Sequence, residues 1–145
     1  YIGFAGVGNL WWSREDLGFS TTYGLSYTDR EDEIPDPAKD GSFVGFRFGW
    51  EYMNKWGKVT TYRNNWNFTN SLNDTSDYYS DMVNSISVAI NSRLALKVSL
   101  QWLYNSLPGL EEVSLFDPNG DEIGVVTIRK EKLDTIFSTS LVVNF

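Results

Sequence analysis

The segment 17-LGFSTTYGLSYT-28 decides the fold class, because its residues alternate between two kinds of side chain. Bulky residues, such as Phe19, Tyr23 and Leu25, occupy most odd positions, whereas the even positions hold only Gly, Ser and Thr. A period of two is typical of a β-strand whose two faces meet different surroundings. The segment therefore predicts a strand with one bulky apolar face and one small polar face.

The same alternation recurs along most of the chain. It is clear in 43-FVGFRFGWEY-52 and 94-LALKVSLQWLYN-105, and weaker in 59–69 and 78–91. No segment has the period of an amphipathic helix. We expect strands at 1–12, 15–29, 42–54, 57–70, 77–91, 94–106 and 131–145. Within the first of them, we expect one face to carry Ile2, Phe4, Leu10 and Trp12.

The connections between these strands alternate in length. Short ones fall near 12–16, 53–58 and 91–93, and long polar ones at 29–42, 70–77 and 105–131. The last contains 117-DPNGDE-122, a strong turn signal between two strand-like runs. We therefore expect an up-and-down antiparallel sheet with two unlike ends, and a hairpin at about 109–130 that projects beyond the sheet.

The composition excludes several chemistries. The chain has no Cys and no His, so a disulfide and a Ser-His-Asp site are both excluded. A formal net charge of −7 argues against nucleic acid as a partner. The alternate positions of Asp117, Asn119 and Asp121 are found in calcium loops, but the Gly and Glu of such loops are missing, so we interpret the segment as a turn. We expect no cofactor, no metal and no enzymatic activity.

The contents of the two faces indicate which solvent surrounds the sheet. The polar face is mostly Gly, Ser, Thr and Asn, which suits a confined interior, and the apolar face carries large aromatic side chains. This arrangement favours a transmembrane β-barrel over a soluble barrel that binds a hydrophobic ligand, or over a β-sandwich. Asn64 counts against it, since it falls on the apolar face. Scattered charges of both signs are expected to face the lumen and to neutralise one another: Arg47, Glu51, Arg63, Asp81, Lys97 and Asp134.

A pair of carboxylates could serve as acid and base, and the candidates among these charges are Glu51 with either Asp81 or Asp134. We interpret the lumen charges as structural. The aromatic residues form two groups that resemble interfacial girdles. Trp12, Trp50 and Tyr52 lie toward the short turns, and Tyr23, Tyr27, Trp102 and Tyr104 toward the long loops.

The C-terminal part of the chain resembles a known family. The segments 84-NSISVAINSRLALKVSLQWLYNSLPG-109 and 132-KLDTIFSTSLVVNF-145 resemble the salt-induced outer-membrane protein family over about 82–145. The segment 109–130 departs from that family's pattern of a short loop. The resemblance implies an outer-membrane β-barrel in a Gram-negative envelope, a link to salt stress and no assigned activity, so it transfers no catalytic residue.

The end of the chain resembles the signal that the barrel-assembly machinery recognises. Its polar, small and terminal hydrophobic positions correspond to Ser138, Ser140, Val143 and Phe145. If Phe145 lies at the periplasmic end, the long loops are extracellular and Tyr1 lies at the extracellular side. Bacterial single-chain barrels have an even number of strands. Seven strands therefore predict that residues 1–145 form one domain that is part of a barrel of 8 or more strands. Missing N-terminal strands or another chain would complete that barrel.

Two functions fit such a barrel in the bacterial outer membrane, in contact with lipid and lipopolysaccharide. The first is a structural, envelope-maintaining or partner-docking barrel with a lumen filled by side chains. The second is a channel or porin for small solutes or ions, which needs more strands because width grows with strand number. We favour the first.

Overall fold

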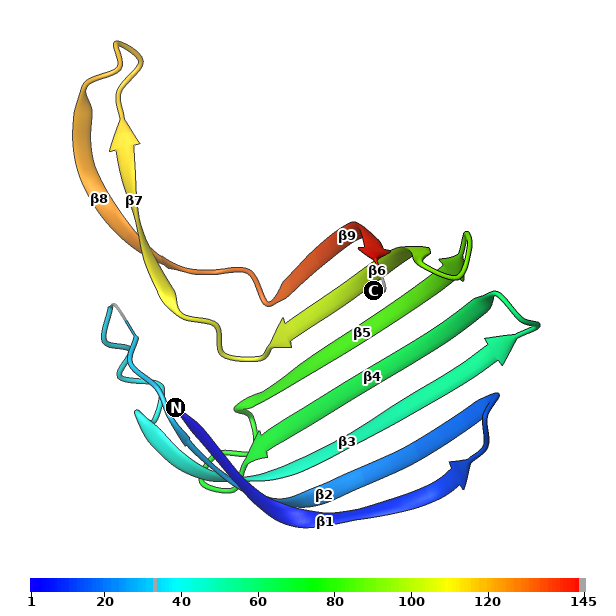
Figure 1. Cartoon of the computed structure of the whole chain (residues 1–145). Coiled ribbons are helices and arrows are strands. Elements are labelled where there is room, and N and C mark those ends of the chain that lie inside the picture. The colour runs from blue at the N-terminus through cyan, green and yellow to red at the C-terminus, as the bar shows by residue number, and fades with distance from the viewer. Residues whose placement is uncertain (33, 144–145) are drawn as a thin grey trace.

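A computed structural model describes residues 1–32 and 34–143 of the chain, and its main body is one curved antiparallel sheet (Figure 1). The strand order β1-β2-β3-β4-β5-β6-β9 follows the chain, so the sheet is an up-and-down meander. The sheet does not close on itself: β1 and β9 are its two edges. Its strands are β1 (Ile2–Ser13), β2 (Leu17–Asp29), β3 (Ser42–Trp56), β4 (Thr60–Ser71), β5 (Tyr78–Ala89), β6 (Leu94–Asn105) and β9 (Leu133–Val143).

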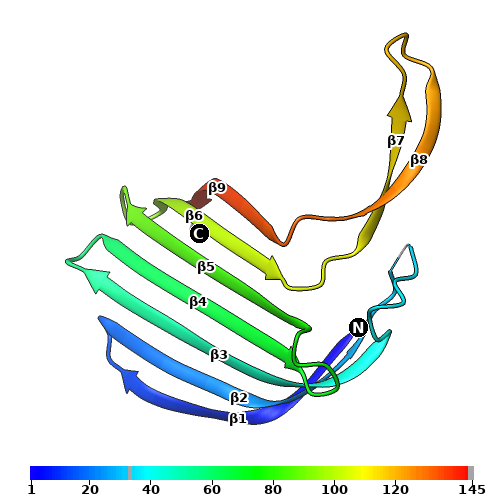
Figure 2. The same ribbon diagram turned by 180° about the vertical axis from the view of Figure 1, so that it is seen from behind.

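These seven strands confirm the all-β antiparallel prediction. The predicted hairpin is also confirmed, because β7 (Leu110–Phe116) pairs with β8 (Glu122–Arg129) and forms a separate two-stranded sheet. Both views show this ribbon rising away from the loop-side end of the main sheet (Figure 2). Within residues 1–32 and 34–143, no helix has the length and apolar character needed to span a membrane.

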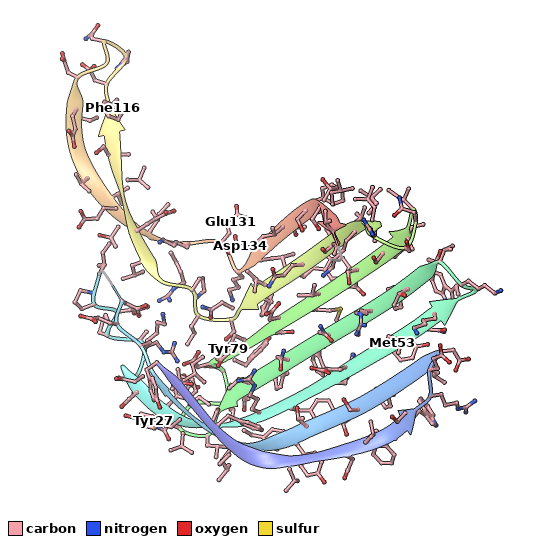
Figure 3. All side chains as sticks on the ribbon, viewed as in Figure 1. Tyr27, Met53, Tyr79, Phe116, Glu131 and Asp134 are labelled. Carbon is pink, nitrogen blue, oxygen red and sulfur yellow. The ribbon has the colours of Figure 1, made fainter. Side chains whose placement is uncertain are left out.

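The strand register places side chains of similar size and polarity opposite one another on neighbouring strands. Tyr23 pairs with Phe48, which pairs with Phe68, and Ile86 pairs with Val98. On the other face Ser85 pairs with Ser99. Each face therefore keeps much of its character from β2 to β6, and side chains project from both faces (Figure 3).

The polar face is the inner side of the curve. Side chains converge on the concave side of a curved sheet, and the buried polar residues Ser26, Thr69 and Ser85 all belong to that face. Phe43, with 2% of its surface exposed, is the one buried hydrophobic residue among those described. Large apolar residues such as Leu96 and Leu141, 45% and 60% exposed, lie on the convex side. The usual order of a soluble domain, apolar inside and polar outside, is thus reversed.

The expected face of the first strand is wrong at one position. Leu10 pairs with Ser20 and Trp12 with Phe19, so the register shifts between them and Trp11 is the extra residue of a β-bulge. The bulge moves Trp12 to the convex face. Three of the residues that we expected to share its face lie on the concave one: Ile2, Phe4 and Leu10.

Two glycines face each other between β1 and β2, where Gly6 pairs with Gly24. A Cβ on Gly24 would lie closer than 3.0 Å to the Ala5 carbonyl oxygen and to the Gly6 Cα, both backbone atoms that cannot give way cheaply. This pair of glycines lets the first two strands follow the curve of the sheet.

We predict that Gly24→Ala lowers the free energy of unfolding by about 1–3 kcal/mol, because the added methyl group overpacks this contact. Urea unfolding of the protein in detergent micelles, followed by tryptophan fluorescence, measures the change. Gly8→Ala, on the same concave face, is the control, since its Cβ would meet nothing closer than 3.4 Å. Equal losses in the two variants would contradict the prediction.

Candidate functional site

The concave face carries the six charged residues predicted to face a lumen. Arg47 and Glu51 lie on β3, Arg63 on β4 and Asp81 on β5. The remaining two lie on β6 and β9: Lys97 and Asp134. In each case the neighbours across the strands are polar-face residues, as Gly24 is for Arg47 and Ser140 for Lys97.

Two of these six charges, Arg47 and Asp81, bind neutral neighbours. Arg47 donates a hydrogen bond to Asn67 Oδ1 at 3.2 Å, and its guanidinium carbon lies 5.5 Å from the centre of the Phe4 ring. Gln101 donates to Asp81 Oδ1 at 2.8 Å. Among the described residues none of the six lies within 4.0 Å of an opposite charge. Within the described sheet these six charges therefore form no ion pair with one another, since the register places uncharged residues opposite each of them, and their neutralisation across a closed lumen stays a prediction.

The carboxylates line two separate hollows. Glu51 and Arg63 border one of about 250 Å³ near the short turns. Asp81 and Asp134 border another of about 360 Å³ near the foot of the hairpin, on either side of Leu103 in the strand register. Glu51 is thus not brought to the other two carboxylates. In the described part of the chain no group of three or more acidic residues is placed to hold a metal ion.

The convex face carries the predicted aromatic residues in contact with one another. Near the short turns, Trp12 packs on Phe19 at 5.4 Å between ring centres, and Phe19 on Tyr52 at 6.4 Å. Trp50 lies farther from the turns, 4.4 Å from Trp66. Toward the loops, Tyr104 stacks on Tyr78 at 5.6 Å. The other predicted aromatics of the loop side are exposed on this face: Tyr23, Tyr27 and Trp102.

Several polar side chains of the convex face bind one another. The Trp50 indole N–H donates to Asn64 Oδ1 at 2.5 Å, and Asn64 donates to Asn84 Oδ1 at 2.9 Å. The Tyr62 hydroxyl also donates to Asn84 Oδ1, at 2.8 Å. Asn64, which counted against an apolar face, is therefore part of a hydrogen-bonded row that leaves no free acceptor at its Oδ1.

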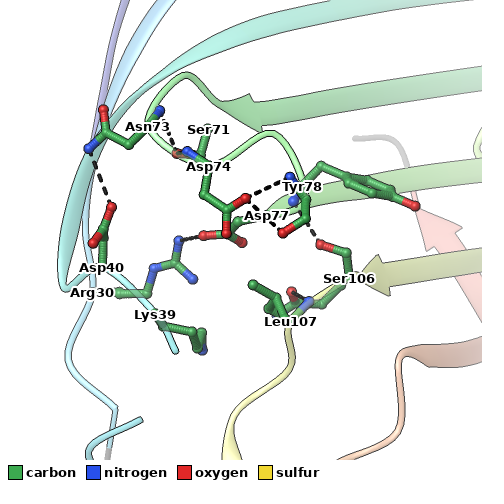
Figure 4. A network of polar contacts seen from close by, with 12 residues as sticks. Arg30, Lys39, Asp40, Ser71, Asn73, Asp74, Asp77, Tyr78, Ser106 and Leu107 are labelled. Carbon is green, nitrogen blue, oxygen red and sulfur yellow. Dashed lines mark hydrogen bonds and ion pairs between the residues drawn. The ribbon is translucent and has the colours of Figure 1, made fainter. Parts of the chain in front are cut away.

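A network of polar contacts fixes the loop-side end of the sheet (Figure 4). Arg30, which follows β2, binds Asp77 Oδ2 at 2.5 Å, and Asp77 is only 4% exposed. The Arg30 guanidinium carbon also lies 4.6 Å from the centre of the Phe43 ring. The β2–β3 loop is thereby held against the β4–β5 turn.

Ser71 and Ser106 extend this network to neighbouring strands. The Ser71 hydroxyl accepts hydrogen bonds from the backbone N–H groups of Asn73 and Asp74, both at 3.2 Å. The Ser106 hydroxyl accepts one from the Tyr78 N–H at 2.7 Å. Every long connection on this side is therefore anchored to a strand end.

The β2–β3 loop also holds the foot of the hairpin. Arg129, the last residue of β8, binds Asp36 Oδ2 at 2.8 Å and donates to the Pro108 carbonyl oxygen at 2.9 Å. Lys39 binds Asp32 at 2.9 Å within the loop. These contacts were not predicted from the sequence, where 29–42 was described only as a long polar connection. The available signal was its two cations, Arg30 and Lys39, among many carboxylates.

Backbone hydrogen bonds keep two of the loop carboxylates charged. The Ala38 N–H, assisted by Arg129, holds the pKa of Asp36 below its ordinary 3.8, and the Asp121 N–H does the same for the pKa of Asp117. A carboxylate with a lowered folded-state pKa stabilises the fold above its ordinary pKa, and that contribution is lost as the pH falls through the lowered value. The tether between loop and hairpin therefore persists at neutral pH. Asp117 closes a turn, as interpreted from the sequence, through Oδ1 bonds from Asn119 and Asp121.

Three residues of the proposed assembly signal lie in β9. Ser138 and Ser140 face the concave side and pair with Ser99 and Lys97, and Val143 pairs with Leu94 on the convex side. Phe145 lies outside the described residues.

Comparison with protein families identifies the chain over most of its length. Residues 1–117 match the family described as "Protein of unknown function, DUF481". The chain belongs to this family. The match reaches well upstream of 82–145, the range over which we noted a resemblance, and includes all strands from β1 to β6. Searches of curated proteins and of solved structures found no match.

We predict that Asp77→Ala lowers the free energy of unfolding by about 2–4 kcal/mol, because it leaves the half-buried Arg30 without its anion. The urea midpoint of the protein in detergent micelles measures this loss. Asp40→Ala, in the β2–β3 loop that Asp77 binds through Arg30, is the control, since Asp40 is exposed and accepts only a 3.4 Å hydrogen bond from Asn73. A control variant as unstable as Asp77→Ala would show that the ion pair is not responsible.

Proposed function

We propose that this chain forms the greater part of an integral outer-membrane β-barrel that has a structural or partner-docking role and no catalytic site. The reversed burial carries the proposal. Large apolar side chains cover the convex face, while Ser, Thr and Asn fill the concave face around a single buried hydrophobic residue, Phe43, in the described chain. Water disfavours such a convex face, and a lipid bilayer favours it.

The directions of the two edge strands limit how the proposed barrel can close. β1 and β9 both run from the loop side to the turn side, since Ile2 pairs with Thr28 and Leu133 with Tyr104. Joined directly, they would be parallel. An open sheet edge is not tolerated in lipid. An odd number of further antiparallel strands, from this polypeptide or another, is therefore proposed to complete the barrel, with at least 8 strands in all.

The contents of the concave face support the structural role over the channel. Small polar residues approach one another closely there: the Ser138 hydroxyl lies 3.4 Å from Ser99 Oγ, and a Cβ on Gly49 would lie 2.9 Å from Asn67 Oδ1. The charged side chains Arg47 and Asp81 are bound to neutral neighbours on this face. We therefore propose that, in the closed barrel, side chains occupy the space that a pore would need.

The proposed location is the bacterial outer membrane. Lipid and lipopolysaccharide would surround the convex face, and the barrel-assembly machinery would recognise the C-terminal strand. The link to salt stress rests only on the resemblance of the C-terminal segment, and it predicts induction of the protein at high salt.

Adjacent residues of β6 provide a test of the lipid-facing surface. Leu100 lies on the convex face opposite Asn84 and Phe137, whereas Gln101 lies on the concave face and donates to Asp81. We predict that Leu100→Arg costs about 2–4 kcal/mol and prevents assembly into lipid vesicles, because it places a charge in hydrocarbon. Gln101→Arg should assemble normally, since the new guanidinium can pair with Asp81. Normal assembly of Leu100→Arg would argue against a lipid-facing convex side.

Conductance of the full-length protein in a planar bilayer separates the two roles. A lumen filled by side chains predicts no steady current. A stable open state, whose ion selectivity changes in Arg47→Ala or Lys97→Ala, would support the channel and overturn the structural role.

A further inference from the structure

The β7–β8 ribbon is an element without a packing partner. Its two strands pair with each other and, among the described residues, with no third strand. It rises clear of the main sheet, with Phe116 near its far end (Figure 3). An isolated two-stranded ribbon is marginally stable in water and normally needs a third strand or a packed face.

One face of the ribbon is an uncovered apolar stripe. Val113 pairs with Val126, and Leu115 and Ile128 lie on the same face along the two strands. All four are between 38% and 46% exposed. Glu111 shares the face of the stripe, opposite Ile128. The opposite face contains Glu112, Ser114 and Glu122 together with the apolar Val125 and Phe116. The two faces therefore favour different side chains in a strand that pairs with the ribbon.

The charge of the ribbon selects among the candidates for that place. Residues 110–129 hold five carboxylates and a single cation, Arg129, which is already bound to Asp36. The neighbouring loop 29–42 is also mainly acidic. A second copy of this chain and an anionic lipid surface would both be repelled, whereas a basic protein segment would be attracted.

The ribbon is held ready for binding by its foot. Besides the Arg129 contacts with Asp36 and Pro108, the Lys130 N–H donates to the Gly109 carbonyl oxygen at 3.0 Å. A surface that is fixed before binding loses less conformational freedom when its partner arrives.

We propose that the β7–β8 ribbon binds an extended, basic segment of a partner protein by strand addition. Apolar side chains of the added strand would continue the stripe of Val113 and Val126, and its alternate Lys or Arg side chains would project on the same side of the ribbon as Glu112 and Glu122. Backbone hydrogen bonds at the free edge supply affinity, and the alternating faces supply specificity. This inference names the partner class for the docking role proposed above and rests on that role.

Binding of synthetic peptides to the full chain in detergent micelles tests the proposal. The probes are a fluorescein-labelled eight-residue Lys-Val repeat and the corresponding Glu-Val repeat, measured by fluorescence anisotropy. The Lys-Val peptide should bind at least about tenfold more tightly than the Glu-Val peptide. Val113→Thr with Val126→Thr should weaken its binding at least about tenfold, with unchanged tryptophan fluorescence of the main sheet.

Charge reversal supplies the matched comparison. Glu112→Lys with Glu122→Lys should invert the preference between the two peptides. Glu15→Lys with Asp16→Lys makes the same change in net charge at the opposite end of the sheet and should leave the preference intact. Equal effects of the two double variants would overturn the proposal, because net charge alone would then explain binding.

Two further outcomes would also overturn it. One is failure of both peptides to bind while the chain dimerises through the ribbon, and the other is ribbon-dependent attachment to vesicles of anionic lipid. The bilayer measurement is independent of these results. If the bilayer carries no current and neither peptide binds, only this inference is contradicted. If the bilayer conducts, the structural role is contradicted.

Discussion

The register of the seven-stranded sheet is the constraint on which the other features depend. Side chains alternate between faces with a period of two, so a slip of one residue between any two strands would exchange the faces of everything beyond it. The pairs Tyr23–Phe48 and Ile86–Val98 keep bulky groups on one side, and Ser85–Ser99 keeps small ones on the other. Small groups on one side and large groups on the other also favour curvature toward the small side. The curvature of the sheet and the reversed burial are thus both consequences of the register.

Much of this architecture could be predicted from the sequence, because a period of two is preserved in most of the main strands. The hairpin was equally visible from its turn, where the Asp117 carboxylate binds two backbone N–H groups. The face of Trp12 could not be predicted, since a bulge at Trp11 inserts one residue without leaving a mark in the composition. Periodicity gives the face of a strand only as far as the next irregularity.

The polar contacts were less predictable than the strands. Charges on the concave face looked like a mutually neutralising set, yet pairing depends on which residues the register places opposite, and Arg47 faces Gly24 and Thr69. The ion pairs that do form join residues far apart in the sequence, such as Arg30 with Asp77 and Asp36 with Arg129. Such pairs arise from the way loops fold over strand ends, and no local pattern encodes them.

There is a physical reason why these ion pairs lie at the loop side and not on the concave face. Inside a narrow polar interior, small hydroxyl and amide groups satisfy one another at low cost, whereas a closed ion pair carries a large desolvation penalty. At the loop side the chain leaves the sheet, backbone pairing ends, and long connections would otherwise be mobile. Arg30–Asp77 and Arg129–Asp36 replace the missing backbone pairs there, and they do so at the foot of the β7–β8 ribbon. The charges that order the loops are therefore the same ones that hold the apolar stripe of the ribbon in a defined position.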